Sequence, residues 1–160
     1  YINLLYKSAP LHDIGKVGVK DNILQKPGKL SSEEFEEMKK HTIYGGQSLT
    51  VGIKELGEDS FLTLAKEIAL THHEKWDGSG YPKGLSKEEI PLSGRLMALS
   101  DVYDALVSKR IYKAALTHAQ AKKIILDGKK SHFDPDIVDA FIKKEDAFIR
   151  IMEEFKDSLK

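Results

Sequence analysis

The chain has no cysteine, no net charge and no long apolar run, and each absence excludes a class of site, of partner or of membrane segment. Without cysteine there are no disulfides, iron–sulfur clusters, thiolate zinc sites or cysteine nucleophiles. The 25 basic residues balance 25 acidic ones, so no overall field attracts a nucleic acid polymer or an anionic membrane. The longest apolar run, Leu96-Met97-Ala98-Leu99, is far short of the roughly 20 residues of a membrane span. We therefore expect no nucleic acid polymer as a partner and no membrane within this segment.

The length and the first residues bear on domain organisation and location. A chain of 160 residues and 18.0 kDa suits one domain, so we expect a single domain over 1–160. Its start, Tyr1-Ile2-Asn3-Leu4-Leu5, lacks the basic and apolar regions of a signal peptide, which predicts a cytoplasmic location. Because the first residue is not Met, we also expect this chain to be a piece of a longer protein.

Apolar residues recur mostly at spacings of three and four, which is typical of amphipathic helices. Capping boxes at Ser31 and Thr117, and Asp134 before Pro135, mark three helix starts. No stretch alternates cleanly enough for a strand, so the sequence predicts an all-α fold with one long glycine-rich loop. The helix after Ser31 should turn Phe35, with Met38, Thr42 and Ile43, toward the core. The expected helices cover about 4–15, a stretch after Ser31, 61–72, 92–107, 117–128 and 134–155, the last bent near Lys144-Glu145.

Four of the six histidines occur in a pattern that also contains carboxylates. Together they form a nitrogen and oxygen donor set on separate helices, which suits iron(II), manganese, zinc, nickel or cobalt. Six ligands exceed what one tetrahedral zinc ion takes, whereas an aspartate shared by two ions would make the set fit a binuclear centre. The candidate ligands are His12, Asp13, His41, His72 and His73, together with Asp101 or Asp104, which lie three residues apart on one helix face.

The stretch His12-Asp13-Ile14-Gly15-Lys16 resembles the signature of the HD superfamily of metal-dependent phosphohydrolases. A second stretch, from His72-His73-Glu74 to Gly80-Tyr81-Pro82, is similar to the signature of its HD-GYP branch. Shorter matches follow in the order of that family, and the resemblance covers about 4–155. These matches are Lys26 to Leu30, His41, Ile90 to Leu92, Ser100 to Leu106 and His132 to Pro135.

The resemblance implies an HD-type helical domain that hydrolyses cyclic di-GMP to pGpG, GMP or both, by attack of a metal-bridging hydroxide. It assigns Asp13 as the bridging ligand within a set of six, namely His12, Asp13, His41, His72, His73 and Asp101. The expected cofactors are two or three divalent ions, with iron or manganese first and zinc, nickel or cobalt as alternatives.

Several further residues take roles from the same resemblance. Lys16 would hold a phosphate oxygen, and Asp104 would support that lysine or a metal-bound water as a second catalytic carboxylate. In the loop, Gly80 and Tyr81 would bind the substrate, and the loop over 77–82 would alternatively contact GGDEF-domain proteins. A phosphate clamp of Arg110 and Lys113 is also expected, although Ile111 replaces the proline that usually follows the arginine.

The family also has an upstream helix with a further Glu/His metal motif, which this chain lacks because His12 is its first histidine. We therefore expect an N-terminally incomplete domain that is itself inactive, preceded in its parent by a receiver or sensor domain. Two other functions stay open. One is another HD-type nucleotide phosphohydrolase, against which the full Gly-Tyr-Pro loop argues. The other is an inactive module for cyclic di-GMP sensing or GGDEF interaction, against which the six retained ligands argue.

Overall fold

The computed structural model describes residues 1–57, 61–108 and 114–157, and this part of the chain is built from helices without a named strand. The all-α prediction is therefore confirmed. No helix in these ranges is both long and apolar enough to cross a membrane. The α-helices are α1 (Ile2–Ser8), α2 (Asp21–Leu24), α3 (Ser32–Lys39), α4 (His41–Leu56), α5 (Phe61–Thr71), α6 (Leu92–Val107), α7 (His118–Asp127), α8 (Pro135–Lys143) and α9 (Glu145–Asp157), and the short 3-10 helices are η1 (Ala9–Leu11), η2 (Ile14–Gly18) and η3 (Lys87–Glu89).

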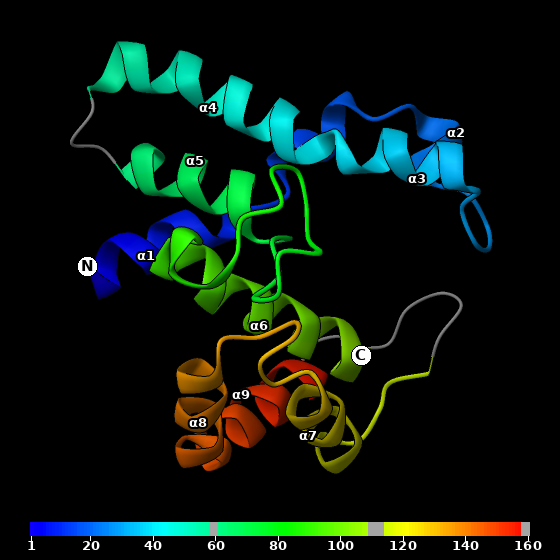
Figure 1. The fold of residues 1–160 in the computed structure, drawn as a ribbon, viewed down its shortest axis with the longest axis vertical. Helices are drawn as coiled ribbons and strands as arrows, with labels where there is room; N and C mark the ends of the chain where they lie inside the picture. Colours follow the sequence, from blue (N-terminus) through cyan, green and yellow to red (C-terminus); the bar gives the residue numbers. More distant parts are fainter. Residues whose placement is uncertain (58–60, 109–113, 158–160) are drawn as a thin grey trace.

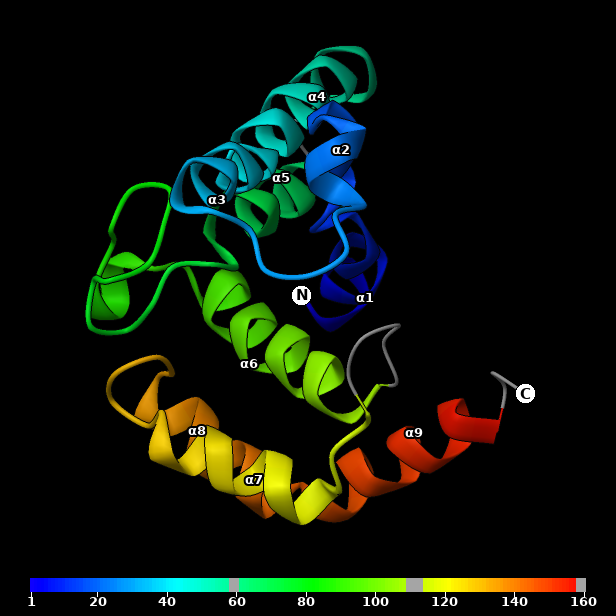
Figure 2. The same ribbon diagram turned by 90° about the vertical axis from the view of Figure 1, so that its right-hand side faces the viewer.

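Helix α6 lies between two groups of helices and contacts both (Figures 1 and 2). On one side α4 and α5 pack together with η1 around Leu49, Ala65 and Ala69. On the other side α7 and α8 pack on α6 around a larger apolar cluster, against which Phe148 of α9 also lies. A residue near the middle of α6 on the side of the first group can therefore face that group while the helix is anchored in the second.

The expected N-terminal helix to Gly15 is wrong in its extent, because α1 already ends at Ser8. Pro10 follows in η1, and a proline both lacks an amide donor and clashes with the preceding turn of an α-helix. The chain then continues as two short 3-10 helices, and His12 and Asp13 lie between them. The break thus places both motif residues at helix ends rather than on a helix face.

The helix predicted after Ser31 ends before His41, although its expected core face extended to Thr42 and Ile43. That helix, α3, stops at Lys39, and His41 is the first residue of α4. There the backbone of η2 touches α4 so closely that a Cβ on Gly15 would lie 1.9 Å from the carbonyl oxygen of His41. Phe35 and Ile43 are exposed, contrary to their expected place in the core, while Thr42 is buried.

The remaining helix signals are confirmed. Ser31 and Thr117 both form capping boxes, and Asp134 caps α8 ahead of Pro135. The expected bend near Lys144 is a break between α8 and α9. Asp134 also accepts a hydrogen bond from Arg95 at 2.6 Å, so its buried carboxylate joins α8 to α6 as well as capping a helix.

Candidate metal centre

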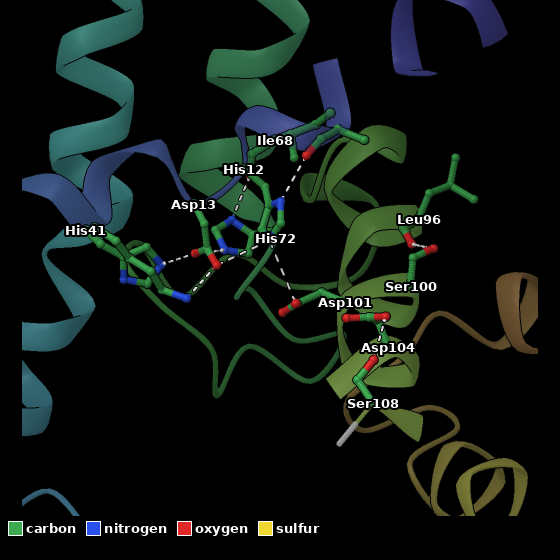
Figure 3. Close-up of polar contacts among 12 residues, drawn as sticks. His12, Asp13, His41, Ile68, His72, Leu96, Ser100, Asp101, Asp104 and Ser108 are labelled. Carbon is green, nitrogen blue, oxygen red and sulfur yellow. Dashed lines mark hydrogen bonds and ion pairs between the residues drawn. The ribbon is translucent and has the colours of Figure 1, made fainter. Parts of the chain in front are cut away.

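Four stretches of the chain bring the six candidate ligands into one region of the fold (Figure 3, which labels all of them but His73). His12 directly follows η1 and Asp13 directly precedes η2, while His41 begins α4. The pair His72-His73 directly follows α5, and Asp101 lies near the middle of α6. Ligand atoms of four of them come within 4.8 Å of one another, namely Asp13, His41, His72 and His73.

The carboxylate of Asp13 lies at the centre, and its two oxygens face different neighbours. Oδ1 is 3.3 Å from Nε2 of His41 and 3.7 Å from Nε2 of His72. Oδ2 is 3.3 Å from Nε2 of His12 and 2.5 Å from Nζ of Lys16. One carboxylate therefore reaches two separate groups of donors, as a ligand shared by two ions must.

The orientation of the imidazole rings is set by backbone carbonyl groups. Nδ1 of His12, His41 and His72 lies 2.9, 2.7 and 3.0 Å from the carbonyl oxygens of residues 9, 38 and 68, respectively. A carbonyl oxygen only accepts, so each Nδ1 carries the proton and each Nε2 presents its lone pair to the centre. This arrangement of a backbone acceptor behind the ring is common among metal-ligating histidines.

Three buried atoms at the centre have no hydrogen-bond partner among the described residues: Asp13 Oδ1, His41 Nε2 and His72 Nε2. An unsatisfied buried polar group costs about 1–3 kcal/mol, so three of them side by side demand an explanation. All three are lone-pair donors that point toward the same space. A divalent cation bound there would satisfy all of them at once, and the donor set fits such an ion.

The protonation states at the centre suit metal binding, which needs ionised carboxylates and neutral imidazoles. Burial lowers the pKa of His41, and lowers that of His73 to about 2 with help from the neighbouring His72 and His41. Burial alone would raise the pKa of Asp13, but the neighbouring His12, His72 and Lys16 outweigh it and hold that pKa far below its usual range.

Asp101 lies beside His12 rather than within the group of four. Its Oδ1 is 3.8 Å from Nε2 of His12, and its side chain is half-buried. Burial lowers the pKa of His12, but bonds to Asp13 and to the Ala9 carbonyl, with the charges of Asp13 and Asp101, raise it overall. His12, Asp101 and the second oxygen of Asp13 thus form a second set of donors next to the first.

Lys16 and Asp104, which are both expected to act near the phosphate, have different surroundings in the structure. Lys16 donates to Asp13 Oδ2, and its half-exposed side chain lies between the centre and solvent. The expected contact between Lys16 and Asp104 is not formed, because Asp104 is exposed and accepts a hydrogen bond from Ser108 instead (Figure 3). The predicted clamp residues Arg110 and Lys113 lie outside the described residues.

The loop after His73 covers one side of the centre. The ring of Tyr81 lies 4.8 Å from that of His73, measured between centroids, with a tilt of 30°. Gly80 has a structural reason to be glycine, since a Cβ there would lie 2.4 Å from the amide nitrogen of Lys75. The structure thus places Tyr81 beside the metal-ligand group and turns Gly80 against the backbone of the loop itself.

On the opposite side, a cavity of about 330 Å³ opens between α1 and α6. Its walls are apolar residues such as Leu5 and Leu96, with His12, Asp101 and Asp104 at its polar end. The second donor set is therefore reached from this cavity rather than from the loop.

Comparison with known proteins agrees with this geometry. A family model described as an HD domain matches residues 3–137. The chain belongs to the HD domain family. Among curated relatives of this HD domain, a cyclic di-GMP phosphodiesterase of Vibrio cholerae serotype O1 is 61% identical over 158 residues, which are 99% of this chain and 32% of the relative. One of the same name from Thermotoga maritima is 44% identical over 159 residues, 98% of this chain and 41% of the relative.

A third relative carries a different substrate in its name. The 3'3'-cGAMP-specific phosphodiesterase 2 of Vibrio cholerae serotype O1 is 44% identical over 155 residues, 97% of this chain and 29% of the relative. The HD domain described here thus spans between 29% and 41% of the length of these relatives. Together with the motifs, they confirm the resemblance to the HD-GYP branch.

The sequence motifs did not reveal the role of Glu74 in this HD domain. Its side chain is 1% exposed, and its two carboxylate oxygens accept the amides of Lys83 at 2.7 Å and Leu85 at 3.1 Å. Glu74 therefore closes the loop that carries Tyr81. The available signal was a carboxylate directly after two histidines, and spacing alone does not tell a loop-closing carboxylate from a ligand.

Proposed function

We propose that the parent protein is a metal-dependent phosphodiesterase that hydrolyses cyclic di-GMP to pGpG, GMP or both. The observation that carries this proposal is the Asp13 carboxylate, which faces bare imidazole nitrogens on one side and His12 on the other. The names of the relatives from Vibrio cholerae and Thermotoga maritima support the substrate. We assign His12, Asp13, His41, His72, His73 and Asp101 as ligands of two divalent ions.

Iron or manganese is our first choice of metal, because histidine nitrogen and carboxylate oxygen suit both, as they do zinc, nickel and cobalt. A pair of such ions supplies charge neutralisation of the phosphodiester and a lowered pKa for attacking water. The remaining chemistry belongs to side chains. Asp13 holds the two halves of the centre together, and Lys16 offers its ammonium to a phosphate oxygen at the exposed edge.

The substrate and the cellular setting complete the proposal. We expect Tyr81 to contact a base, and Arg110 with Lys113 to contact phosphate. Because cyclic di-GMP is a bacterial second messenger, we expect the enzyme to act in the cytoplasm under a receiver or sensor domain of the parent. GGDEF-domain proteins are further candidate partners of the loop over 77–82.

A second candidate substrate is 3'3'-cGAMP, which differs from cyclic di-GMP in one base. The relative whose name carries this substrate is 44% identical to the chain, the same identity as the Thermotoga maritima relative. The metal centre acts on phosphate and does not distinguish the two. The choice between them depends on residues that touch the bases.

A longer piece of the parent is expected to complete the second donor set. The cavity beside His12 and Asp101 is open, and the apolar Ile2 and Tyr6 of α1 are exposed nearby in the chain. We expect a piece with the preceding residues to bind more metal per chain and to melt at a higher temperature, since ligands that bind only the native state stabilise it. Equal metal content and melting temperature would contradict this.

The deciding experiment is metal analysis of anaerobically purified parent protein, followed by chromatography of its products. We expect about two ions per chain, and pGpG or GMP from cyclic di-GMP, with mononucleotides untouched. Assays with 3'3'-cGAMP in parallel separate the two candidate substrates. Protein that binds metal but cleaves neither dinucleotide would contradict the proposed activity.

A further inference from the structure

An aromatic side chain lies where the helical pattern predicts a core residue. Phe35 of α3 is 44% exposed, and its ring meets that of Tyr81 edge to face, at a centroid distance of 6.1 Å. Tyr81 in turn lies against His73 of the metal centre. Ring contacts therefore continue from the metal-ligand group, across the loop, to α3. The loop and α3 lie side by side in Figures 1 and 2.

A lysine lies over both of the outer rings. Nζ of Lys39 is 5.0 Å from the ring centroid of Phe35 and 5.5 Å from that of Tyr81, within the usual range of a cation–π contact. Its ionic partner is Glu36, at 2.7 Å, whose side chain is 67% exposed. Such exposed pairs contribute no more than about 1 kcal/mol, so the ammonium can exchange this partner for a ligand at little cost.

Two rings at the rim of a phosphate-cleaving centre, with a cation above them, have the chemistry of a purine site. Aromatic faces stack on any base. An ammonium selects guanine, because O6 and N7 of guanine both accept, whereas adenine presents an amino donor in place of O6. The aromatic rings would therefore bind any base, whereas the ammonium of Lys39 would distinguish guanine from adenine.

We infer that one base of the cyclic dinucleotide stacks on Phe35 with the ring of Tyr81 against its edge, and that Lys39 selects guanine by donating to O6 and N7. This inference rests on the proposed function and extends it to the choice of base. It places the base on α3 and the loop while the phosphate lies at the metal centre. It also names a residue that distinguishes cyclic di-GMP from an adenine-containing substrate.

The test compares Lys39→Gln and Phe35→Ala in the metal-loaded parent protein, with Lys40→Gln as the matched control. Lys40 is the next residue and pairs with Glu37. Initial rates are measured for cyclic di-GMP, 3'3'-cGAMP and cyclic di-AMP. Binding of hydrolysis-resistant phosphorothioate analogues of cyclic di-GMP and cyclic di-AMP is measured separately by calorimetry.

We expect Lys39→Gln to raise KM for cyclic di-GMP by roughly tenfold or more, with kcat and metal content nearly unchanged. The preference for the cyclic di-GMP analogue over the cyclic di-AMP analogue should fall by a similar factor. Phe35→Ala should weaken all substrates alike, by roughly fivefold to a hundredfold, because stacking does not read the base. Lys40→Gln should behave as wild type.

Each contrary outcome has its own meaning. Unchanged preference in Lys39→Gln, or an equal loss for guanine and adenine ligands, would overturn the inference while leaving the phosphodiesterase activity in place. Wild-type protein that binds the cyclic di-GMP analogue through Lys39 but cleaves no dinucleotide would overturn the proposed function alone. Protein that neither binds nor cleaves any of them would overturn both.

Discussion

At the scale of single residues, Asp13 connects the two donor sets of the centre. Its Oδ1 lies among imidazole nitrogens that have no other partner, and its Oδ2 lies between His12 and Lys16. Burial of this carboxylate is tolerable because positive or hydrogen-bonding groups surround it. The residue is thus central both to metal binding and to the charge balance of the site.

Asp13→Ala is expected to remove both ions, because the shared carboxylate serves each of them. Metal content per chain is measured by elemental analysis of the parent protein, wild type and variant. Asp21→Ala is the control, since Asp21 is an exposed carboxylate at the start of α2. A variant with full metal occupancy would show that Asp13 does not bridge two ions.

Lys16→Ala is expected to leave metal content intact and to lower turnover by roughly tenfold to a thousandfold, or about 1.4–4 kcal/mol of transition-state stabilisation. The reason is that its ammonium pairs with a ligand but is not one, and it reaches the exposed edge where phosphate would bind. Exposed Lys20 provides the control, because Lys20→Ala removes the same charge away from the centre. Loss of metal in Lys16→Ala would contradict this role.

At the scale of elements, the loop between α5 and α6 is held at several points. Glu74 closes it from within, and its backbone also bonds to the connection between α7 and α8, through Trp76 to His132 and Asp77 to Ser131. The loop therefore positions Tyr81 as part of the folded structure. A binding residue held in this way loses little conformational entropy when a ligand arrives.

Glu74→Gln is expected to loosen this loop and to cost about 1–3 kcal/mol of stability. The amide can accept only through its oxygen, so one of the two amides that Glu74 now binds faces a donor instead. Hydrogen exchange should increase at Lys83 and Leu85, with metal content unchanged. Glu89→Gln tests an exposed carboxylate of the same loop and should have a smaller effect. Identical hydrogen exchange in Glu74→Gln and wild type would contradict the closure of the loop by Glu74.

At the scale of the whole molecule, the metal centre is assembled from segments that are far apart in the chain. The candidate ligands come from the junction of η1 and η2, the start of α4, the residues after α5, and α6, which is also anchored by the second helix group. The proposed metal binding would therefore be coupled to folding, because the candidate ligands converge only in the folded chain. The protonation of the histidines enters the same balance.

Metal-free protein is expected to lose stability as the pH falls below about 6.5, the pKa of histidine in an unfolded chain. The pKa values of His41 and His73 are lowered by folding, the latter to about 2, so the unfolded chain takes up protons that the folded chain refuses. Their contribution is complete above about pH 6.5 and declines toward pH 2. His12, whose pKa is raised, acts in the opposite direction.

Urea unfolding after treatment with a chelator, at pH values from 7.5 to 5.0, measures this effect. His73→Gln should show a weaker dependence on pH, because one of the groups that refuse protons is gone. Metal should also leave the wild-type protein below about pH 6, because protons compete for the imidazole ligands. Constant stability of the metal-free protein across this range would contradict the protonation states described for the centre.

Local sequence accounts for the helical class and most helix starts, and it supplied the candidate donor set. Capping boxes at Ser31 and Thr117, and the proline after Asp134, act on neighbouring residues, so their effect can be read from local sequence. The candidate ligand set rests on residue types and on the HD-GYP motifs, and the structure brings ligand atoms of Asp13, His41, His72 and His73 within 4.8 Å of one another.

Tertiary contacts decide how closely the start of α4 is packed, which ring Phe35 meets and what Glu74 binds. Each depends on residues that are distant in the sequence: the close approach of Gly15 to the α4 backbone, the ring of Tyr81 on Phe35, and the amides of Lys83 and Leu85 on a buried carboxylate. Periodicity describes one helix face at a time and carries no information about which face meets a loop. The physical reason is that packing between segments, rather than local preference, determines the surroundings of each side chain.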